Sequence, residues 1–149
     1  MKILVTGGLG YIGSHTVVEL CENNYEVVIV DDLSNSKIEV LDKIEEITEK
    51  KIKFYLGDVC DKELMDKIFS EEHIDGVIHF AGFKAVGESV LNPLKYYHNN
   101  LETTINLLET MDKHEVYNIV FSSTATVYGN PEVLPVQEDF PLTTTNPYA

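Results

Sequence analysis

The chain has 149 residues, 44% of them hydrophobic, which suits one globular domain with its own core rather than a disordered segment. Its formal net charge of −14 argues against nucleic acid and anionic membrane surfaces as partners. No apolar run approaches the roughly 20 residues of a membrane span, and the first strand-like run leaves no room for a signal peptide. Since Cys21 and Cys60 have no metal-binding spacing, we expect a cytoplasmic protein with reduced thiols.

The first thirteen residues predict a strand, a glycine turn and a helix start. An apolar run (3–5) leads into Gly7, Gly10 and Gly13, spaced G-x-x-G-x-x-G. One glycine permits a tight turn, one lets the backbone approach phosphates, and one allows close packing of helix on strand. The helix N-terminus offers free N–H groups and positive dipole charge to an anion. This predicts a dinucleotide pyrophosphate site, with a purely structural turn as the alternative.

The next strand carries a second sign of a dinucleotide site. The run 25–30 is apolar and ends in Asp31-Asp32. An acidic residue about 20 positions beyond the glycines is placed to bind the adenosine ribose through its hydroxyls. Because a carboxylate there should repel a 2′-phosphate, the sequence favours NAD over NADP.

Helix-like and strand-like segments then alternate along the chain. Strands are expected at 52–56, 76–80 and 116–121, and helices at 12–22, 37–50, 61 onward and 93–113. The loop 33–36 offers N-cap residues for the second helix, and Asp61 caps the third. The expected inward residues are Val40, Leu41, Ile44 and Ile47, then Leu64, Met65, Ile68 and Phe69, then Leu94, Tyr97, Leu101, Ile105 and Leu108.

This βαβαβαβαβ order predicts an α/β fold, a Rossmann-type doubly wound parallel sheet of order 3-2-1-4-5 with helices on both faces. Prolines break any regular element beyond Gly129. Polar and glycine residues follow the strands at the carboxyl edge, where such sheets bind ligands. The five histidines share no spacing, so we expect no metal site, and His79 is expected to be a buried, hydrogen-bonded residue.

Seven stretches together resemble the extended short-chain dehydrogenase/reductases, and within them the UDP-glucose 4-epimerases. The run HFAGFKAVGES is the stretch most similar to the epimerases, whereas runs like TGGLGYIG and FSSTATVYG occur across the extended group. The stretches are TGGLGYIG (6–13), VDDLSNS (30–36), GDV (57–59), HFAGFKAVGES (79–89), YYHNN (96–100), FSSTATVYG (121–129) and NPYA (146–149).

The resemblance implies tightly held NAD, a UDP-hexose substrate, a 4-keto intermediate and a homodimer. Tyr148 falls on the tyrosine of the family's Tyr-x-x-x-Lys motif and would take the proton from the sugar 4-hydroxyl, while the Thr124 hydroxyl would hold the 4-oxygen. The implied cofactor residues are Gly7, Gly10, Tyr11, Ile12 and Gly13 at the pyrophosphate, Asp31, Asp32, Leu33, Ser34, Asn35 and Ser36 around the ribose, Asp58 and Val59 at the adenine, and Phe80, Ala81, Gly82, Lys84, Asn99 and Ser122 along the central channel.

A tyrosine, with a pKa near ~10 in water, needs positive charge nearby to act as a base at pH 7. The motif lysine that supplies such charge would come four positions after Tyr148, past Ala149. We therefore expect residues 1–149 alone to bind NAD without epimerising at a useful rate. Two alternatives are another extended reductase acting on nucleotide sugars, such as a dehydratase or decarboxylase, and a non-catalytic NAD-binding module. A dehydratase should carry acidic residues at 125–127, and this chain has none.

Overall fold

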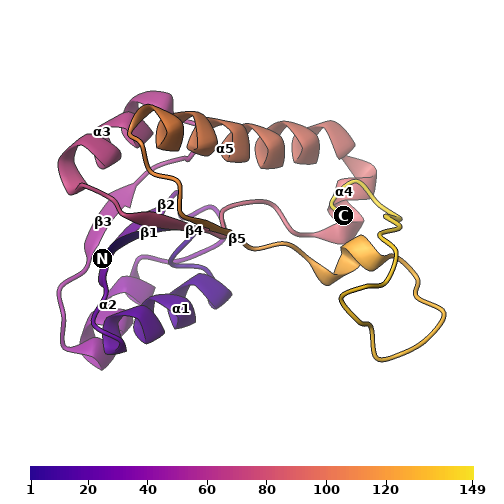
Figure 1. Ribbon diagram of the computed structural model, residues 1–149, viewed down its shortest axis with the longest axis horizontal. Coiled ribbons are helices and arrows are strands. Elements are labelled where there is room, and N and C mark those ends of the chain that lie inside the picture. Colours follow the sequence, from indigo (N-terminus) through magenta and orange to yellow (C-terminus); the bar gives the residue numbers. More distant parts are fainter.

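A computed structural model describes all residues, 1–149, around a five-stranded sheet with helices on both faces (Figure 1). The strands are β1 (Lys2–Thr6), β2 (Glu26–Asp31), β3 (Lys53–Leu56), β4 (Gly76–His79) and β5 (Ile119–Phe121). Every neighbouring pair is parallel, and the order is β3-β2-β1-β4-β5. The predicted fold and strand order are confirmed.

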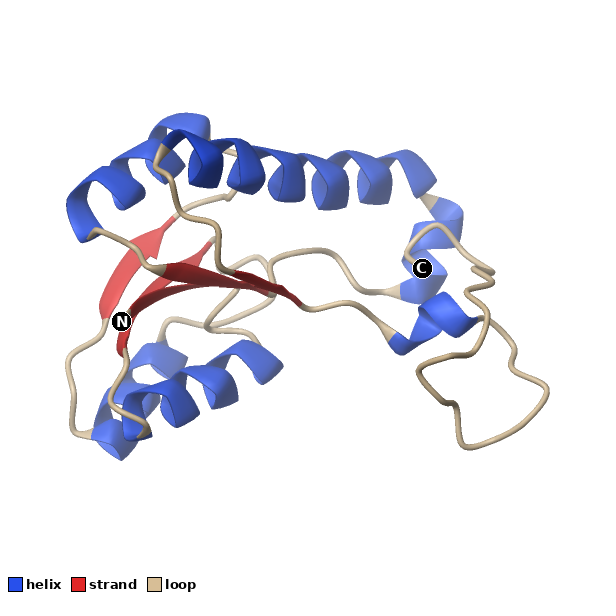
Figure 2. Ribbon diagram, in the orientation of Figure 1, coloured by secondary structure: helices blue, strands red, loops and turns tan.

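Two helices lie on each face of the sheet (Figure 2). One face carries α1 (Tyr11–Glu22) and α2 (Glu39–Thr48), and the other carries α3 (Lys62–Glu72) and the long α5 (Pro93–Lys113). A short α4 (Val86–Leu91) precedes α5, and one 3₁₀ turn, η1 (Ala125–Tyr128), follows β5. None of these helices combines the length and the apolar composition that a membrane span needs.

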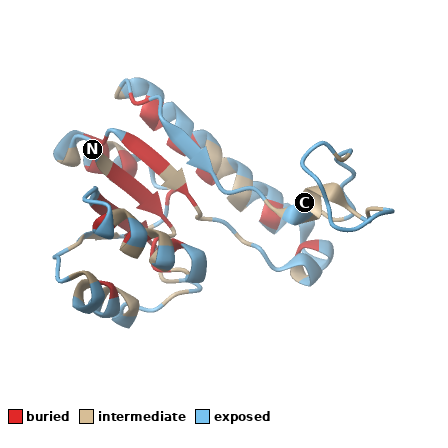
Figure 3. Cartoon of the chain, turned by 60° about the horizontal axis from the view of Figure 1, so that its bottom comes forward, coloured by how far each residue is buried: buried red, intermediate tan, exposed pale blue.

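The core has two layers, one on each side of the sheet (Figure 3). Because successive strand side chains point to opposite faces, Leu4 packs toward α3 and α5, while Val5 packs toward α1 and α2. Cys21 is buried in the second layer, as expected for a helix-borne thiol. The Asp61 carboxylate caps α3, as predicted, by accepting bonds from the amides of Glu63 and Leu64.

The face that α5 buries is not the predicted one. The expected apolar stripe is exposed, and the opposite face, which mixes polar and apolar residues, packs on the sheet. The exposed residues are Leu94, Tyr97, Leu101, Ile105 and Leu108, and the buried ones are Tyr96, Thr103, Asn106, Leu107, Thr110 and Met111. Polar side chains tolerate this burial because they find hydrogen-bond partners inside: Thr110 donates to the Asn106 carbonyl at 2.8 Å, and Asn106 donates to the Val59 carbonyl.

Two expectations about α2 are also wrong. Ile47 is exposed rather than buried, and Ile44 is the one residue of α2 that is fully enclosed. Ile38 takes the N-cap position without a side-chain cap, since the Ser34 and Ser36 hydroxyls bond to the carboxylates of Asp32 and Asp31 instead.

Candidate functional site

The glycine turn between β1 and α1 needs glycine for two separate reasons. Gly7 has a φ of +66°, a backbone conformation that residues with a side chain rarely adopt, and a Cβ there would lie 2.9 Å from the Ala81 nitrogen. A Cβ on Gly13 would overlap the Gly7 carbonyl oxygen, so the helix could not approach the turn so closely. Gly10 is the N-cap of α1, and its N–H donates to Gly7 at 3.1 Å. The turn and packing roles expected for Gly7 and Gly13 thus have a geometric basis.

The first turn of α1 presents unused hydrogen-bond donors. The amides of Tyr11, Ile12 and Gly13 find no acceptor in the protein, and the helix bonds begin with Ser14 donating to the Gly10 carbonyl at 2.9 Å. Free N–H groups at the positive end of a helix favour an anion. The turn therefore presents free donors of the kind that bind phosphate groups.

Asp31, at the end of β2, joins the glycine turn to the loop that follows β2. Its Oδ2 accepts a bond from the Leu9 amide at 3.0 Å, and its Oδ1 accepts from the Leu33 amide at 3.0 Å and from the Ser36 hydroxyl at 2.7 Å. The residue is only 7% exposed. The carboxylate is therefore a structural link as well as a wall of the neighbouring cleft.

Two other acidic residues fix nearby backbone in the same way. The Asp32 carboxylate accepts from the amide and the hydroxyl of Ser34, at 2.9 and 2.7 Å. Asp58, in the turn after β3, accepts from the Cys60 amide at 2.8 Å. Both loops are thereby held in place where they border the cleft.

Two adjoining clefts run along the carboxyl edge of the sheet and share the walls formed by Gly7, Gly10 and residues 80–84. The first, about 460 Å³, includes Asp31, Asp32, Ser34, Asn35, Ser36, Asp58, Val59, Lys84 and Asn99. The second, about 500 Å³, includes Tyr11, Ile12, Gly13, Lys84, Ser122, Thr124 and Tyr148. Of the predicted site residues only Leu33 lies outside both, because its side chain packs against the α1–α2 core layer.

The segment 80–85, between β4 and α4, forms the wall common to both clefts. Ala81 donates its N–H to the Thr6 hydroxyl at 3.2 Å, and Phe83 donates its N–H to Asn100 Oδ1 at 2.8 Å. Asn100 also donates through Nδ2 to the Phe83 carbonyl at 2.9 Å. Side chains from β1 and α5 thus take the place of a neighbouring strand.

Of the two lysines that border the first cleft, one is paired with a carboxylate and the other is not. Lys95 is paired with Glu88, with 2.5 Å between Nζ and Oε1, and it lies over the Phe83 ring. Lys84 makes no hydrogen bond or ion pair with any protein group, so its ammonium is free to meet an anionic ligand.

Beneath this segment, His79 is buried as predicted. Its Nδ1 lies 2.6 Å from the Thr6 hydroxyl and its Nε2 lies 3.4 Å from the Thr104 hydroxyl. Burial lowers the pKa of His79 to about 4, so the ring is neutral near pH 7.

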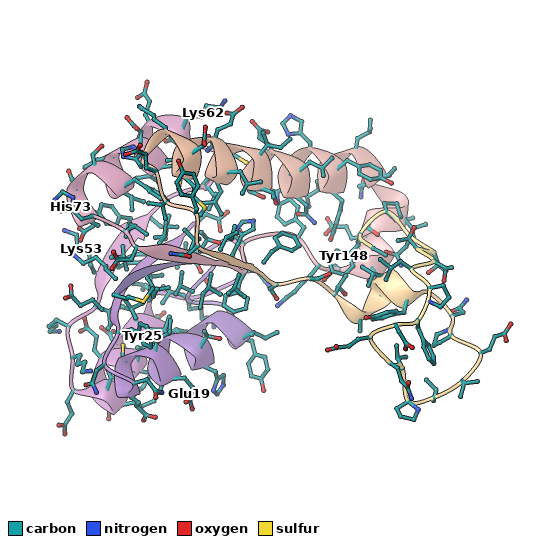
Figure 4. All side chains as sticks on the ribbon, in the orientation of Figure 1. Glu19, Tyr25, Lys53, Lys62, His73 and Tyr148 are labelled. Atoms are coloured by element: carbon teal, nitrogen blue, oxygen red, sulfur yellow. The ribbon has the colours of Figure 1, made fainter.

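The two predicted catalytic residues both border the second cleft. Thr124 caps η1, its hydroxyl oxygen accepting from the Thr126 amide at 3.2 Å. The Tyr148 amide donates to the hydroxyl of buried Ser89 in α4 at 3.3 Å. Tyr148 therefore lies beside α4, in the part of the chain beyond β5 (Figure 4).

Sequence reasoning missed three residues that hold this wall in place, two of which, Tyr96 and Asn100, also border the clefts. Thr6, Tyr96 and Asn100 bond to the segment 80–85 but were not among the predicted site residues. One signal was present: Asn99 and Asn100 form a pair of poor helix formers inside a long helix. For Thr6 and Tyr96, sequence alone offers no such sign.

The chain matches a family profile described as GDP-mannose 4,6 dehydratase over residues 4–149. The chain belongs to this family. It is 61% identical over 148 residues to the UDP-glucose 4-epimerase of Bacillus subtilis. The matched stretch covers 99% of this chain and 44% of that protein. The predicted resemblance to the epimerases is confirmed, and it extends over their N-terminal part.

Solved structures agree with the sequence comparison. The UDP-glucose 4-epimerase of Bifidobacterium longum, crystallised with NAD+ and UDP, superposes with a TM-score of 0.97 at 53% identity, covering 99% of this chain and 44% of that one. The enzyme from Stenotrophomonas maltophila, with bound NAD and formylated UDP-arabinopyranose, gives 0.95 at 45% identity with the same coverage. The chain spans less than half the length of these relatives.

Proposed function

We propose that this chain is the NAD-binding part of an enzyme that interconverts UDP-glucose and UDP-galactose at C4. The observation that carries the proposal is the continuous wall from Asp31 to Tyr148 at the carboxyl edge of the sheet. Free amides at the start of α1 suit the pyrophosphate, and Asp31 suits the ribose of NAD but not a 2′-phosphate. Relatives crystallised with NAD and with UDP-sugars support the same assignment.

In this proposal the residues of the second cleft handle the proton. The Tyr148 hydroxyl, as phenolate, takes the proton from the sugar 4-hydroxyl and later returns it, while the Thr124 hydroxyl holds the 4-oxygen. The bound dinucleotide supplies hydride exchange at its nicotinamide. Lys84 and the first-turn amides of α1 hold the ligand's charged groups in place.

The cofactor assignment is tested on the purified chain. We expect that denaturing it releases close to one NAD(H) per chain and no NADP, or that the nucleotide-free chain binds NAD on titration. A chain that carries no nucleotide and binds none would contradict the proposal.

The reaction is tested by joining residues 1–149 to the remainder of the Bacillus subtilis relative. We expect this chimera to convert UDP-glucose to UDP-galactose, whereas residues 1–149 alone do so negligibly. Tyr148→Phe should lower the rate about 100-fold or more, the usual contribution of a positioned base. Tyr117→Phe, at an exposed site far from the clefts, is the matched control.

The two alternatives give different outcomes in the same assay. A nucleotide-sugar dehydratase would release a product lighter by one water, although the η1 turn that follows Thr124 contains no acidic residue. A non-catalytic NAD-binding module would bind NAD, but its chimera would leave UDP-glucose unchanged. Either result would replace the epimerase assignment.

We also propose that the protein is cytoplasmic and forms a homodimer through the exposed apolar stripe of α5. Tyr97, Leu101, Ile105 and Leu108 are exposed and follow one another at spacings of four, four and three residues, as in a helix–helix seam. Light scattering after gel filtration should give twice the chain mass, and Leu101→Glu should give the single-chain mass. A monomer at the highest soluble concentration would contradict the dimer.

A further inference from the structure

The wall segment 80–85 is held at alternate amides by side chains, and the last of these contacts is made by Tyr96, which also borders both clefts. The Ala85 amide donates to the Tyr96 hydroxyl oxygen at 3.2 Å. The segment is extended here, so Ala81, Phe83 and Ala85 turn their amides toward the protein. Lys84 lies between the last two of these anchored positions and borders both clefts.

Tyr96 is itself held on two sides. Its hydroxyl donates to Glu88 Oε2 at 2.8 Å, and Lys95 occupies the other oxygen of the same carboxylate at 2.5 Å. The Tyr96 side chain is almost fully buried, with its ring 5.6 Å from that of Phe83. A buried hydroxyl that both accepts and donates in this way has one fixed orientation, because each of its partners is also bonded.

We propose that Tyr96 is a positioning residue that sets where Lys84 meets the ligand, with Glu88 fixing its hydroxyl. The inference rests on the proposed NAD site. Asn100 fixes the backbone on one side of Lys84, and Tyr96 fixes it on the other. Without the Tyr96 hydroxyl, the Ala81 and Phe83 amides keep their partners but the Ala85 amide loses its own, so Lys84 samples more positions and NAD binds more weakly.

Tyr96→Phe tests this, because it removes one oxygen and keeps the buried ring. We expect NAD to bind about 5-fold more weakly, the usual effect of losing one hydrogen bond. Hydrogen exchange at the Ala85 amide should accelerate, while exchange at Val5 in β1 should stay unchanged. Tyr117→Phe, whose hydroxyl bonds to nothing in the protein, should bind NAD as the wild type does.

A double-mutant cycle with Lys84→Ala separates positioning from a general loss of stability. If Tyr96 acts through Lys84, Tyr96→Phe should weaken NAD binding by less than about 2-fold in the Lys84→Ala background. A loss of NAD affinity of about 5-fold that persists in the Lys84→Ala background would overturn this inference but not the proposed function. Unchanged NAD affinity in Tyr96→Phe despite faster exchange at Ala85 would do the same. A wild-type chain that binds no NAD would overturn the proposed function as well.

Should Tyr96→Phe fail to fold, Glu88→Ala serves in its place, because it leaves Tyr96 intact and removes the acceptor of its hydroxyl. Faster exchange at Ala85 together with weaker NAD binding is then expected. Wild-type NAD affinity in this variant would overturn the inference.

Discussion

The Thr6 hydroxyl and the His79 ring are joined by a buried hydrogen bond of 2.6 Å between Oγ1 and Nδ1. Because the Thr104 hydroxyl donates its proton to the Asn100 carbonyl, its oxygen is left to accept from Nε2–H, and this tautomer makes Nδ1 the acceptor of the Thr6 hydroxyl proton. The Thr104 hydroxyl beside Nε2 donates onward to the Asn100 carbonyl at 2.9 Å. One directed chain of bonds thus connects β1, β4 and α5 under the clefts.

This arrangement predicts that His79 makes the fold sensitive to acid. Its pKa is about 4 in the folded chain and near ~6.5 in the unfolded chain, so the unfolded chain binds more protons between these values. Neutral His79 makes its full contribution to the free energy of unfolding above about pH 6.5. That contribution, about 3 kcal/mol at most, is lost as the pH falls to about 4. Urea unfolding of wild type and His79→Gln at several pH values measures it.

His79→Gln should be less stable than wild type at pH 7, and its free energy of unfolding should fall less steeply from pH 6.5 to 4. His15→Gln, at an exposed site, should follow the wild-type curve. Carboxylates titrate alike in all three proteins and cancel in the comparison. Parallel curves for wild type and His79→Gln would show that the ring does not titrate with this shift.

Alanine substitutions at three glycines should affect stability and NAD binding to different extents. Gly13→Ala should destabilise the chain by about 2–3 kcal/mol, because the new Cβ meets the Gly7 backbone oxygen. Gly10→Ala has its nearest contact at 3.2 Å, so it should cost little stability but weaken NAD binding, since Gly10 borders both clefts. Thermal unfolding and NAD titration of the same samples distinguish the two effects.

Gly87→Ala is the control for these variants. It lies in α4 with nothing within 4 Å of the new Cβ, so the better helix propensity of alanine should raise stability by up to about 1 kcal/mol. Equal losses of stability in Gly10→Ala and Gly13→Ala would contradict the geometry of the turn.

The face of α5 that packs on the sheet can be tested with two leucines. Leu107→Ala should cost about 3 kcal/mol, because Leu107 is 0% exposed in the core. Leu101→Ala should cost less than about 1 kcal/mol in the isolated chain, since Leu101 is 56% exposed. Chemical unfolding of both variants at low protein concentration, where self-association is weak, measures this. The reverse order would restore the face predicted from the sequence.

Asp31→Ala should destabilise the chain by about 3 kcal/mol, because three donors lose a buried charged acceptor. Asp32→Ala should cost less than about 1 kcal/mol, since Asp32 is exposed to solvent. Urea unfolding at pH 7 compares the two. Equal effects would mean that the Asp31 carboxylate does not hold the glycine turn.

The sheet could be predicted because its strands carry continuous apolar runs between helical segments. The run 27–30 is buried on both sides, as is typical of a central parallel strand. All candidate site residues except Leu33 border the two clefts at the carboxyl edge of the sheet, where parallel sheets of this kind bind ligands. Local pattern located each strand, although β5 begins at Ile119 rather than at residue 116, and the topology rules for parallel sheets gave the strand order.

The face of α5 could not be predicted, because counting apolar residues treats every polar one as exposed. Thr103 and Thr110 can be buried because each hydroxyl bonds to a carbonyl of its own helix, three or four residues back. Asn106 can be buried because its side chain reaches the Val59 carbonyl in another part of the fold. The same holds for Tyr96, whose partner Ala85 lies eleven positions away along the chain. Tertiary hydrogen bonds between side chain and backbone leave no periodic signal.

The bonds already made by Asp31 limit what it can offer to a ligand. An ionised carboxylate has about four acceptor positions, and Leu9, Leu33 and Ser36 occupy three of them. In the proposed NAD complex, one position on Asp31 is left for a ribose hydroxyl, and the loop 32–36 is the nearest source of a partner for the other hydroxyl. In that complex a carboxylate and its neighbouring loop would recognise the ribose together, so shortening the loop should weaken NAD binding even with Asp31 in place.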